Sequence, residues 1–110
     1  MSRSDLQGSL DLLVLKTLSQ RGRLHGYGIA LHIQKASDEL LQVEEGSLYP
    51  ALQRMLREGL LEAKEGISAK GRPTRIYRLS KAGLKRLEQE KSSYEKMFAG
   101  INCVLAVAKA

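Results

Sequence analysis

The sequence has few of the residues that form disulfides, bind metals or build an aromatic core. Cys103 is the only cysteine, which excludes an intrachain disulfide and a thiolate metal cluster and fits a reducing cytoplasm. There is no tryptophan and only one phenylalanine, so a core must be built from leucine, isoleucine, valine and methionine. His25 and His32 could share one side of a helix but have no nearby third ligand. We therefore expect no metal and no cofactor.

Signals for export or membrane insertion are also missing. The first residues lack the apolar run and cleavage pattern of a secretion signal. The longest nearly apolar run, residues 97–108, contains 12 residues, well short of the ~20 needed to span a bilayer. We expect a cytoplasmic protein that does not bind a membrane.

An excess of basic residues is present instead. The 110 residues are close to the commonest size of one domain, and 43% of them are apolar. With 18 basic and 12 acidic residues, the formal charge is +6 and the pI is about 9.7. This balance favours a polyanionic partner without proving one.

Apolar spacing predicts two helices in the first forty residues. The first covers residues 9–20, with Ser9 as its N-cap, and is apolar nearly all round, which is typical of a central helix. The second covers residues 26–37. A short apolar stretch at residues 40–43 follows, and we expect it to pair as a minor strand at the edge of a later hairpin.

A third helix is predicted from about residue 45 to a stop at Gly59. Pro50 is expected in its first turn, where the missing N–H does no harm. One side of this helix is apolar, and its stripe is Leu48, Leu52, Met55 and Leu56. The opposite side carries Ser47, Pro50, Gln53, Arg54 and Arg57.

A hairpin and a long helix complete the prediction. Residues 60–67 and 74–79 have strand patterns and are joined by the basic loop 68–73, with Tyr77 in the core at the hairpin root. Ser80 is expected to cap the last helix. Along that helix, apolar side chains recur in alternating steps of three and four, interrupted by Lys91. They are Leu84, Leu87, Tyr94, Phe98, Ile101, Leu105 and Ala108.

This order of elements is that of the winged helix-turn-helix. The expected fold class is therefore α+β, mainly α, with residues 1–80 as a DNA-binding domain and residues 81–110 as a dimerisation helix. The third helix would enter the major groove, and the hairpin tip would reach the backbone or the minor groove. Arginine and glutamine can read base edges, whereas serine and tyrosine usually bond phosphates. The predicted DNA contacts are Ser47, Tyr49, Pro50, Gln53, Arg54, Arg57, Lys70, Arg72 and Arg75.

Five stretches follow one another along the chain: Gly8-Ser-Leu-Asp-Leu-Leu-Val-Leu, His25-Gly-Tyr-Gly-Ile, Glu45-Gly-Ser-Leu-Tyr-Pro-Ala-Leu-Gln-Arg-Met, Glu58-Gly-Leu-Leu and Gly71-Arg-Pro-Thr-Arg-Ile-Tyr-Arg-Leu-Ser-Lys-Ala-Gly. In this order they resemble the PadR-like transcriptional regulators. The resemblance implies a repressor that binds a near-palindromic operator as a homodimer and is often released by a small molecule. The single helix after the hairpin is similar to the family's short-tailed branch, so effector pockets of longer-tailed members do not carry over.

Several side chains have alternative interpretations. Tyr27 is expected to pack between helices rather than to reach a phosphate. Arg54 and Arg57 could simply solvate a helix face. Cys103 is expected to be a small buried apolar residue, although a redox-sensitive disulfide across a dimer is also open.

The last helix also has more than one interpretation. Its apolar seam is predicted to be a dimer interface, but it could pack on the first helix of its own chain, or do both. Tyr94, Phe98 and Ile101 could line an effector pocket, although interface packing is the simpler interpretation. A winged-helix module that binds protein without DNA is the main functional alternative. An enzyme is not expected, because no nucleophile, base and orienting group recur in a known arrangement.

Overall fold

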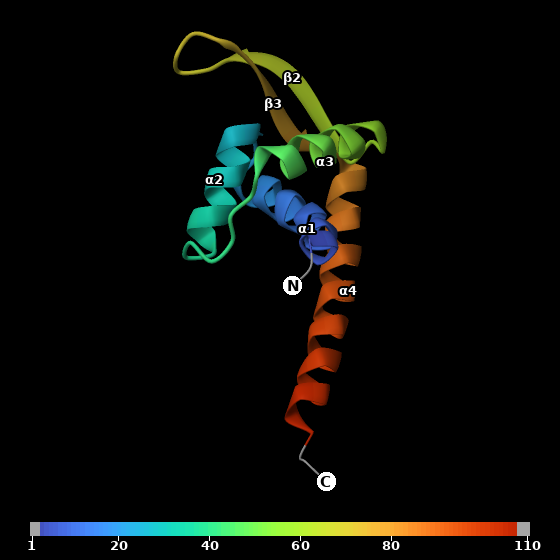
Figure 1. The fold of residues 1–110 in the computed structure, drawn as a ribbon. Helices are drawn as coiled ribbons and strands as arrows, with labels where there is room; N and C mark the ends of the chain where they lie inside the picture. Colours follow the sequence, from blue (N-terminus) through green and yellow to red (C-terminus); the bar gives the residue numbers. More distant parts are fainter. Residues whose placement is uncertain (1–2, 108–110) are drawn as a thin grey trace.

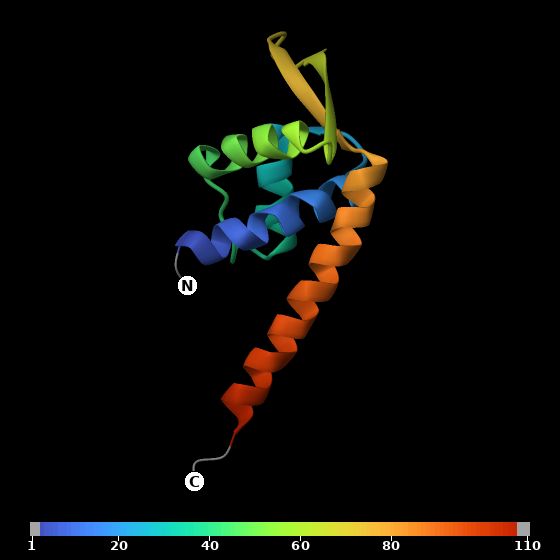
Figure 2. The ribbon, with the colours of Figure 1, turned by 90° about the vertical axis from the view of Figure 1, so that its right-hand side faces the viewer.

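Helices and a small antiparallel sheet form the computed structural model, which describes residues 3–107 and, from residue 9 on, their side chains. In chain order, the elements are α1 (Arg3–Arg21), β1 (Leu24–His25), α2 (Gly26–Ala36), α3 (Glu45–Arg57), β2 (Leu61–Ile67), β3 (Pro73–Leu79) and α4 (Lys81–Ala106). The β2–β3 hairpin rises from a body made by α1, α2 and α3, while α4 leaves that body in the opposite direction (Figures 1 and 2). The predicted mainly helical winged helix-turn-helix is confirmed.

The first helix is longer than its pattern predicted. α1 begins at Arg3, so Ser9 lies inside the helix, and the prediction that Ser9 is the N-cap is wrong. No proline interrupts residues 3–8, and the helix therefore continues through them. The expected central position is confirmed, because Leu10, Val14, Leu15 and Leu18 are all buried.

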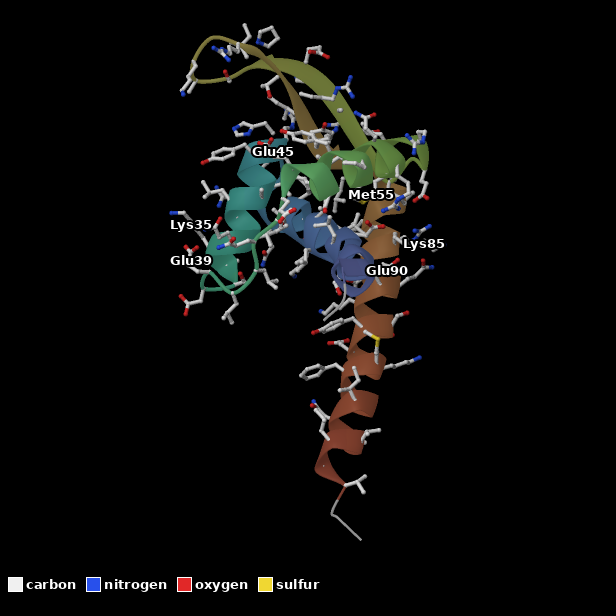
Figure 3. The ribbon with its side chains drawn as sticks, in the orientation of Figure 1. Lys35, Glu39, Glu45, Met55, Lys85 and Glu90 are labelled. Carbon is white, nitrogen blue, oxygen red and sulfur yellow. The ribbon has the colours of Figure 1, made fainter. Side chains whose placement is uncertain are left out.

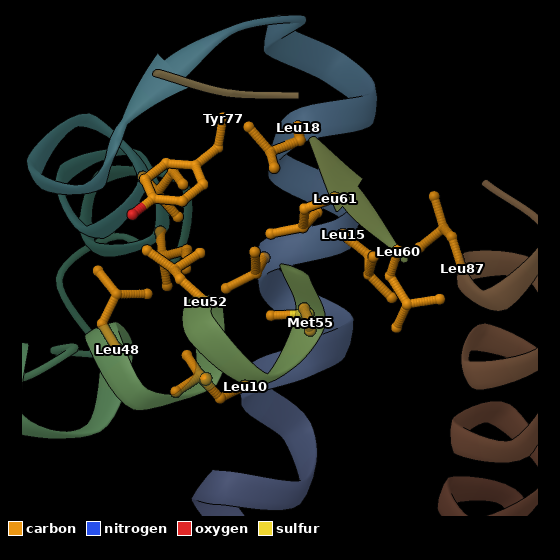
Figure 4. Close-up of a cluster of buried hydrophobic side chains, with 14 residues drawn as sticks. Leu10, Leu15, Leu18, Leu48, Leu52, Met55, Leu60, Leu61, Tyr77 and Leu87 are labelled. Atoms are coloured by element: carbon orange, nitrogen blue, oxygen red, sulfur yellow. The ribbon is translucent and has the colours of Figure 1, made fainter. Parts of the chain in front are cut away.

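The core is aliphatic, as the composition predicted. Side chains from α1, α2, α3, the sheet and the start of α4 meet in one cluster (Figure 4). Tyr77 from β3 is the one aromatic residue among the buried core residues of the described part of the chain, and it is 3% exposed. Its predicted place at the root of the hairpin is confirmed. The apolar side of α3 enters the same cluster through Leu48, Leu52 and Met55.

The minor strand comes from a different segment than expected. The sheet has the order β1-β3-β2, and Leu24 of β1 pairs with Tyr77 of β3. Residues 40–43 form no strand, and the side chain of Leu40 is 85% exposed, so that prediction is wrong. The physical reason is the turn before them. Asp38 and Glu39 both have positive φ angles, of 55° and 68°, which lead the chain from α2 straight towards α3.

Helix α3 tolerates its proline in an unexpected place. Pro50 is the sixth residue of α3, not part of its first turn as predicted. Because proline has no N–H, the carbonyl of Gly46 loses its usual intrahelical donor. Gly46 is exposed, so water can satisfy that carbonyl. The predicted stop is confirmed, since Gly59 follows the helix with φ of +76°.

Helix α4 begins in the core and ends far from it. The hydroxyl of Ser80 accepts a hydrogen bond from the Gly83 N–H at 3.0 Å, which confirms the predicted cap. Leu87 is 4% exposed and packs in the core of its own chain, whereas residues 91–107 are all exposed. The described part of the molecule is therefore elongated, with extents of 62 × 28 × 22 Å. No helix within residues 3–107 is long and apolar enough to cross a membrane.

Candidate nucleic-acid interface

The exposed side of α3 carries the first half of the predicted site. Pro50, Gln53 and Arg57 are exposed on it, and Ser47 is half-buried at its start. The opposite side of α3 is fixed in the core, so the polar side must face outward. The helix thus presents a hydroxyl, an amide and a cation along one surface.

Tyr49 lies where α3 meets the start of α2. Its ring packs against Gly26, and a Cβ on Gly26 would lie only 2.9 Å from the Tyr49 Cε1 atom. The absence of a side chain at Gly26 therefore allows α2 to approach the ring. Tyr49 remains 41% exposed, which leaves part of its surface available to a partner.

Tyr27 is a surface residue, and the expectation that it packs between helices is wrong. Its side chain is 64% exposed on the first turn of α2. The first turn is held by His25, whose Nδ1 accepts a hydrogen bond from the Gly28 N–H at 3.0 Å. The rings of Tyr27 and His25 are nearly parallel, with centroids 6.3 Å apart. The spacing pattern of α2 gave a weak signal here, because Tyr27 falls beside, not on, its apolar stripe.

The hairpin tip places two cations at the end of the wing. Lys70 and Arg72 are both exposed in the loop between β2 and β3. The loop is closed by the Ser68 N–H, which donates to the Arg72 carbonyl at 2.8 Å. Gly71 has φ of +78° in this loop, a conformation that favours glycine. The tip is thus a defined turn that extends well away from the helices (Figure 1).

Arg75 connects the wing to α3. Arg75 and Tyr77 are two positions apart along β3, so their side chains lie on the same face of the sheet. Burial raises the pKa of the Tyr77 hydroxyl, the Arg75 cation opposes that effect, and Tyr49 adds a smaller increase. His25 of β1 pairs with Ile76 of β3, and Gly26, the next residue, packs against the ring of Tyr49. The base of the wing and the start of α3 therefore lie close together.

Arg54 is held differently from the other predicted contacts. Its Nη2 atom lies 2.6 Å from Oδ1 of Asp11 on α1. Its Nη1 atom lies 3.6 Å from Oε1 of Glu58. The hydrogen bond to Asp11 is the main reason why the pKa of Arg54 is raised. The structure thus joins Arg54 to α1, which spacing along α3 alone could not indicate.

The predicted dimerisation residues divide into two groups. Leu87 lies in the core of its own chain, and so satisfies the alternative that the helix packs on its own domain. Leu84, Tyr94, Phe98, Ile101 and Leu105 are between 41% and 76% exposed. On the outer half of α4, side chains extend on all sides without another element beside them (Figure 3). Ala108, the last residue of the predicted seam, lies outside the described residues.

Tyr94, Phe98 and Cys103 on the outer part of α4 are all exposed. The rings of Tyr94 and Phe98 stack with centroids 6.0 Å apart. Cys103 is exposed in the single chain, so the expectation of burial is not met within one protomer. Among the described residues, no three His, Cys, Asp or Glu side chains group as a metal site requires.

Comparison with known proteins gives a consistent family signal. Residues 14–89 match the profile of the Transcriptional regulator PadR-like family. A transcriptional regulator from Clostridium thermocellum is 28% identical, with a TM-score of 0.81 over 90% of this chain and 95% of that chain. A PadR-like transcriptional regulator from Bacillus cereus is 30% identical, with a TM-score of 0.78 over 96% and 99% of the two chains. Bacillus subtilis PadR in complex with operator DNA is 22% identical and similar in fold, with a TM-score of 0.64 over 73% of this chain and 45% of that chain.

Proposed function

Because this chain belongs to the PadR-like family of transcriptional regulators, we propose that it binds a near-palindromic DNA operator as a homodimer and represses transcription. The family is one of regulators and not of enzymes. Bacillus subtilis PadR, which shares the fold, was solved with operator DNA, and this supports DNA as the partner. A regulator acts where the chromosome lies, so the proposed location is the cytoplasm.

The observation that carries the proposal is the exposed polar side of α3, which lies beside the base of the wing. The start of α3 enters the major groove, where Gln53 and Arg57 read base edges. Ser47 and Tyr49 bond phosphates and fix the register, with Pro50 beside them. Tyr27 is added to the predicted contacts, because its side chain is exposed and the residue before it, Gly26, packs against Tyr49.

The wing supplies the second contact. Lys70 and Arg72 at its tip bind the neighbouring backbone or the minor groove, and Arg75 binds phosphate nearer to α3. These cations are exposed and act without sequence preference, whereas Gln53 is expected to select a base. Replacement of Gln53 by alanine should therefore change which base is preferred, and an equal loss on every sequence would contradict its proposed role.

The homodimer is proposed from the exposed seam on α4. Tyr94, Phe98, Ile101 and Leu105 leave a large apolar surface in water in the single chain. A two-fold dimer would cover it and would match the two half-sites of a near-palindromic operator. Sedimentation of the wild type and of a Tyr94→Glu, Phe98→Glu variant tests this. We expect a dimer and a monomer, respectively, and two identical masses would contradict the assignment.

A small-molecule effector is the least defined part of the proposal. The family resemblance implies that a ligand releases the repressor from DNA. In the proposed dimer, Tyr94, Phe98 and Ile101 pack against the partner helix, and we assign no effector pocket to them. The division into a DNA-binding domain of residues 1–80 and a dimerisation helix of residues 81–110 is proposed on the same basis.

The direct test is fluorescence anisotropy on the promoter upstream of the protein's own gene. A scrambled duplex of equal length is the control, and both are titrated at two salt concentrations. We expect tight binding to the promoter alone, which weakens as salt rises. Equal and weak binding to both duplexes, together with salt-insensitive binding to a protein, would favour the interaction-module alternative.

A further inference from the structure

A chain of ion pairs connects three helices beneath the candidate interface. Asp11 of α1 bonds Arg54 of α3 at 2.6 Å, and the other side of the Arg54 guanidinium lies 3.6 Å from Glu58. Nη1 of Arg86 on α4 lies 3.9 Å from the same Glu58 carboxylate. Glu58 is the C-cap residue of α3, so this series of ion pairs connects α1, the end of α3 and α4.

The first link of this chain is the strongest. The Asp11 side chain is only 15% exposed, whereas those of Arg54, Glu58 and Arg86 are 40%, 41% and 39% exposed. A short, charge-assisted hydrogen bond to a mostly buried carboxylate holds its geometry well. Exposed ion pairs at longer distances contribute little each. Among these ion pairs, Asp11–Arg54 is therefore the one that can hold α1 and α3 in a fixed geometry.

From residue 9 on, where side chains are described, no other hydrogen bond or ion pair joins α1 to α3, and the two helices also meet in the apolar core. Leu52 and Met55 of α3 share the core with Leu10 and Val14 of α1 (Figure 4). Apolar contacts resist separation but are non-directional, so they tolerate a small slide or rotation of one helix on another. The Asp11–Arg54 hydrogen bond is directional, and it sits towards the end of α3 that is away from Tyr49. It can therefore fix the direction in which the start of α3 points.

We propose that the Asp11–Arg54 pair sets the angle of α3 to α1 and α4, and thereby determines which spacing between operator half-sites the dimer accepts. Arg54 is then a positioning residue and not a DNA contact, in contrast to Arg57 one turn along. This inference rests on the proposed function, because the two copies of α3 must be joined through α4 for their angle to define a spacing.

The sensitivity of spacing to helix angle follows from DNA geometry. Each inserted base pair moves one half-site by about 3.4 Å and rotates it by about 34° around the axis. A rigid dimer matches one spacing, and neighbouring spacings cost contacts in one half-site. If α3 can tilt on α1, the dimer adapts to neighbouring spacings, and the difference in affinity shrinks.

The experiment uses a duplex selected from a random pool by the wild-type protein. From it, a series is made in which the centre between the half-sites is shortened or lengthened by one base pair. Asp11→Asn removes the charge and keeps the shape. Glu62→Gln is the matched control, because it also removes one carboxylate from an arginine pair, with Arg78 at 2.8 Å, but on the wing.

We expect the wild type and Glu62→Gln to prefer the selected spacing by about tenfold or more. Asp11→Asn should prefer it by about threefold or less, even if free Arg54 raises its affinity for every duplex. The ratio between spacings, not the affinity, is therefore the readout. Arg57→Gln provides a second comparison, since it should weaken binding at all spacings and leave the ratio unchanged.

Thermal unfolding of each variant shows whether it is folded at the assay temperature. If Asp11→Asn is unfolded there, Arg54→Gln takes its place, because it removes the same pair from the α3 side and should lower the ratio in the same direction. A wild type that selects no duplex would overturn the proposed function and this inference with it. A selective wild type with an equally selective Asp11→Asn variant would overturn the inference alone.

Discussion

Replacement of Arg72 by alanine should change the salt dependence of DNA binding by a predictable amount. Each protomer carries an exposed Arg57, Lys70, Arg72 and Arg75 on the proposed interface, so a dimer brings about eight cations to the phosphates. Because each neutralised phosphate contributes about −0.9, the slope of log K against log salt should be about −7. Arg54 is left out of this sum, since Asp11 already neutralises it.

The Arg72→Ala dimer lacks two of these cations. Its slope should therefore be shallower by about two units, near −5, while specific and scrambled duplexes lose affinity by similar factors. Fluorescence anisotropy at four or more salt concentrations on both duplexes measures the slope. The loss should be similar on both, because a wing tip that contacts phosphate reads no base.

Arg78→Ala is the matched control for this prediction. Arg78 lies on the same hairpin, but it faces away from Tyr77 and its Nε atom is paired with Glu62 at 2.8 Å. Its removal should leave the slope close to that of the wild type. If both variants changed the slope equally, binding would follow total charge and not the wing tip. An unchanged slope in Arg72→Ala would refute the proposed wing contact.

Three further predictions concern stability, each measured by urea unfolding. Gly83→Ala should destabilise the fold by about 1–3 kcal/mol, because its Cβ would overlap the carbonyl oxygen of Leu60; an unchanged midpoint would show that α4 shifts freely. Tyr77 holds its proton more tightly when folded, since burial raises its pKa above the unfolded value of about 10. The contribution of the protonated Tyr77 to folding stability is therefore complete below about pH 10 and is lost as the pH rises further. Between pH 8 and about 10.5, the Tyr77→Phe variant should lose less stability than the wild type. Equal losses in the two proteins would contradict this. Glu39→Gly should stabilise by about 0.5–1 kcal/mol by relieving the positive φ of 68°; a loss would show that the hydrogen bond from Gln34 to Glu39 is the larger effect.

The elements that depend on local pattern were predictable from the sequence. The apolar stripe of α3, the hairpin and the Ser80 cap follow from side-chain spacing and capping preferences, which act over a few residues. The aliphatic core followed from composition, because the chain has little else to bury. The position of Gly59 at the end of α3 followed from the need for a positive φ there.

Features that depend on contacts between distant residues were not predictable in this way. The minor strand formed at Leu24 and His25 and not at residues 40–43. The packing of the helices places the segment between α1 and α2 beside β3, where Leu24 pairs with Tyr77. Helical spacing left Tyr27 ambiguous, and only the arrangement of α2 on the body placed it in solvent.

The sequence by itself determined the order of the helices and the hairpin, the aliphatic core and the residues that make up a basic helix and wing. Tertiary structure decided which of those basic side chains are paired with an acidic residue of another helix. Arg54 and Arg57 are alike in type and lie on the same helix, yet only Arg54 comes within hydrogen-bonding distance of Asp11, a residue 43 positions away. Periodicity describes one helix at a time, whereas the partner of a charged side chain depends on how several helices pack.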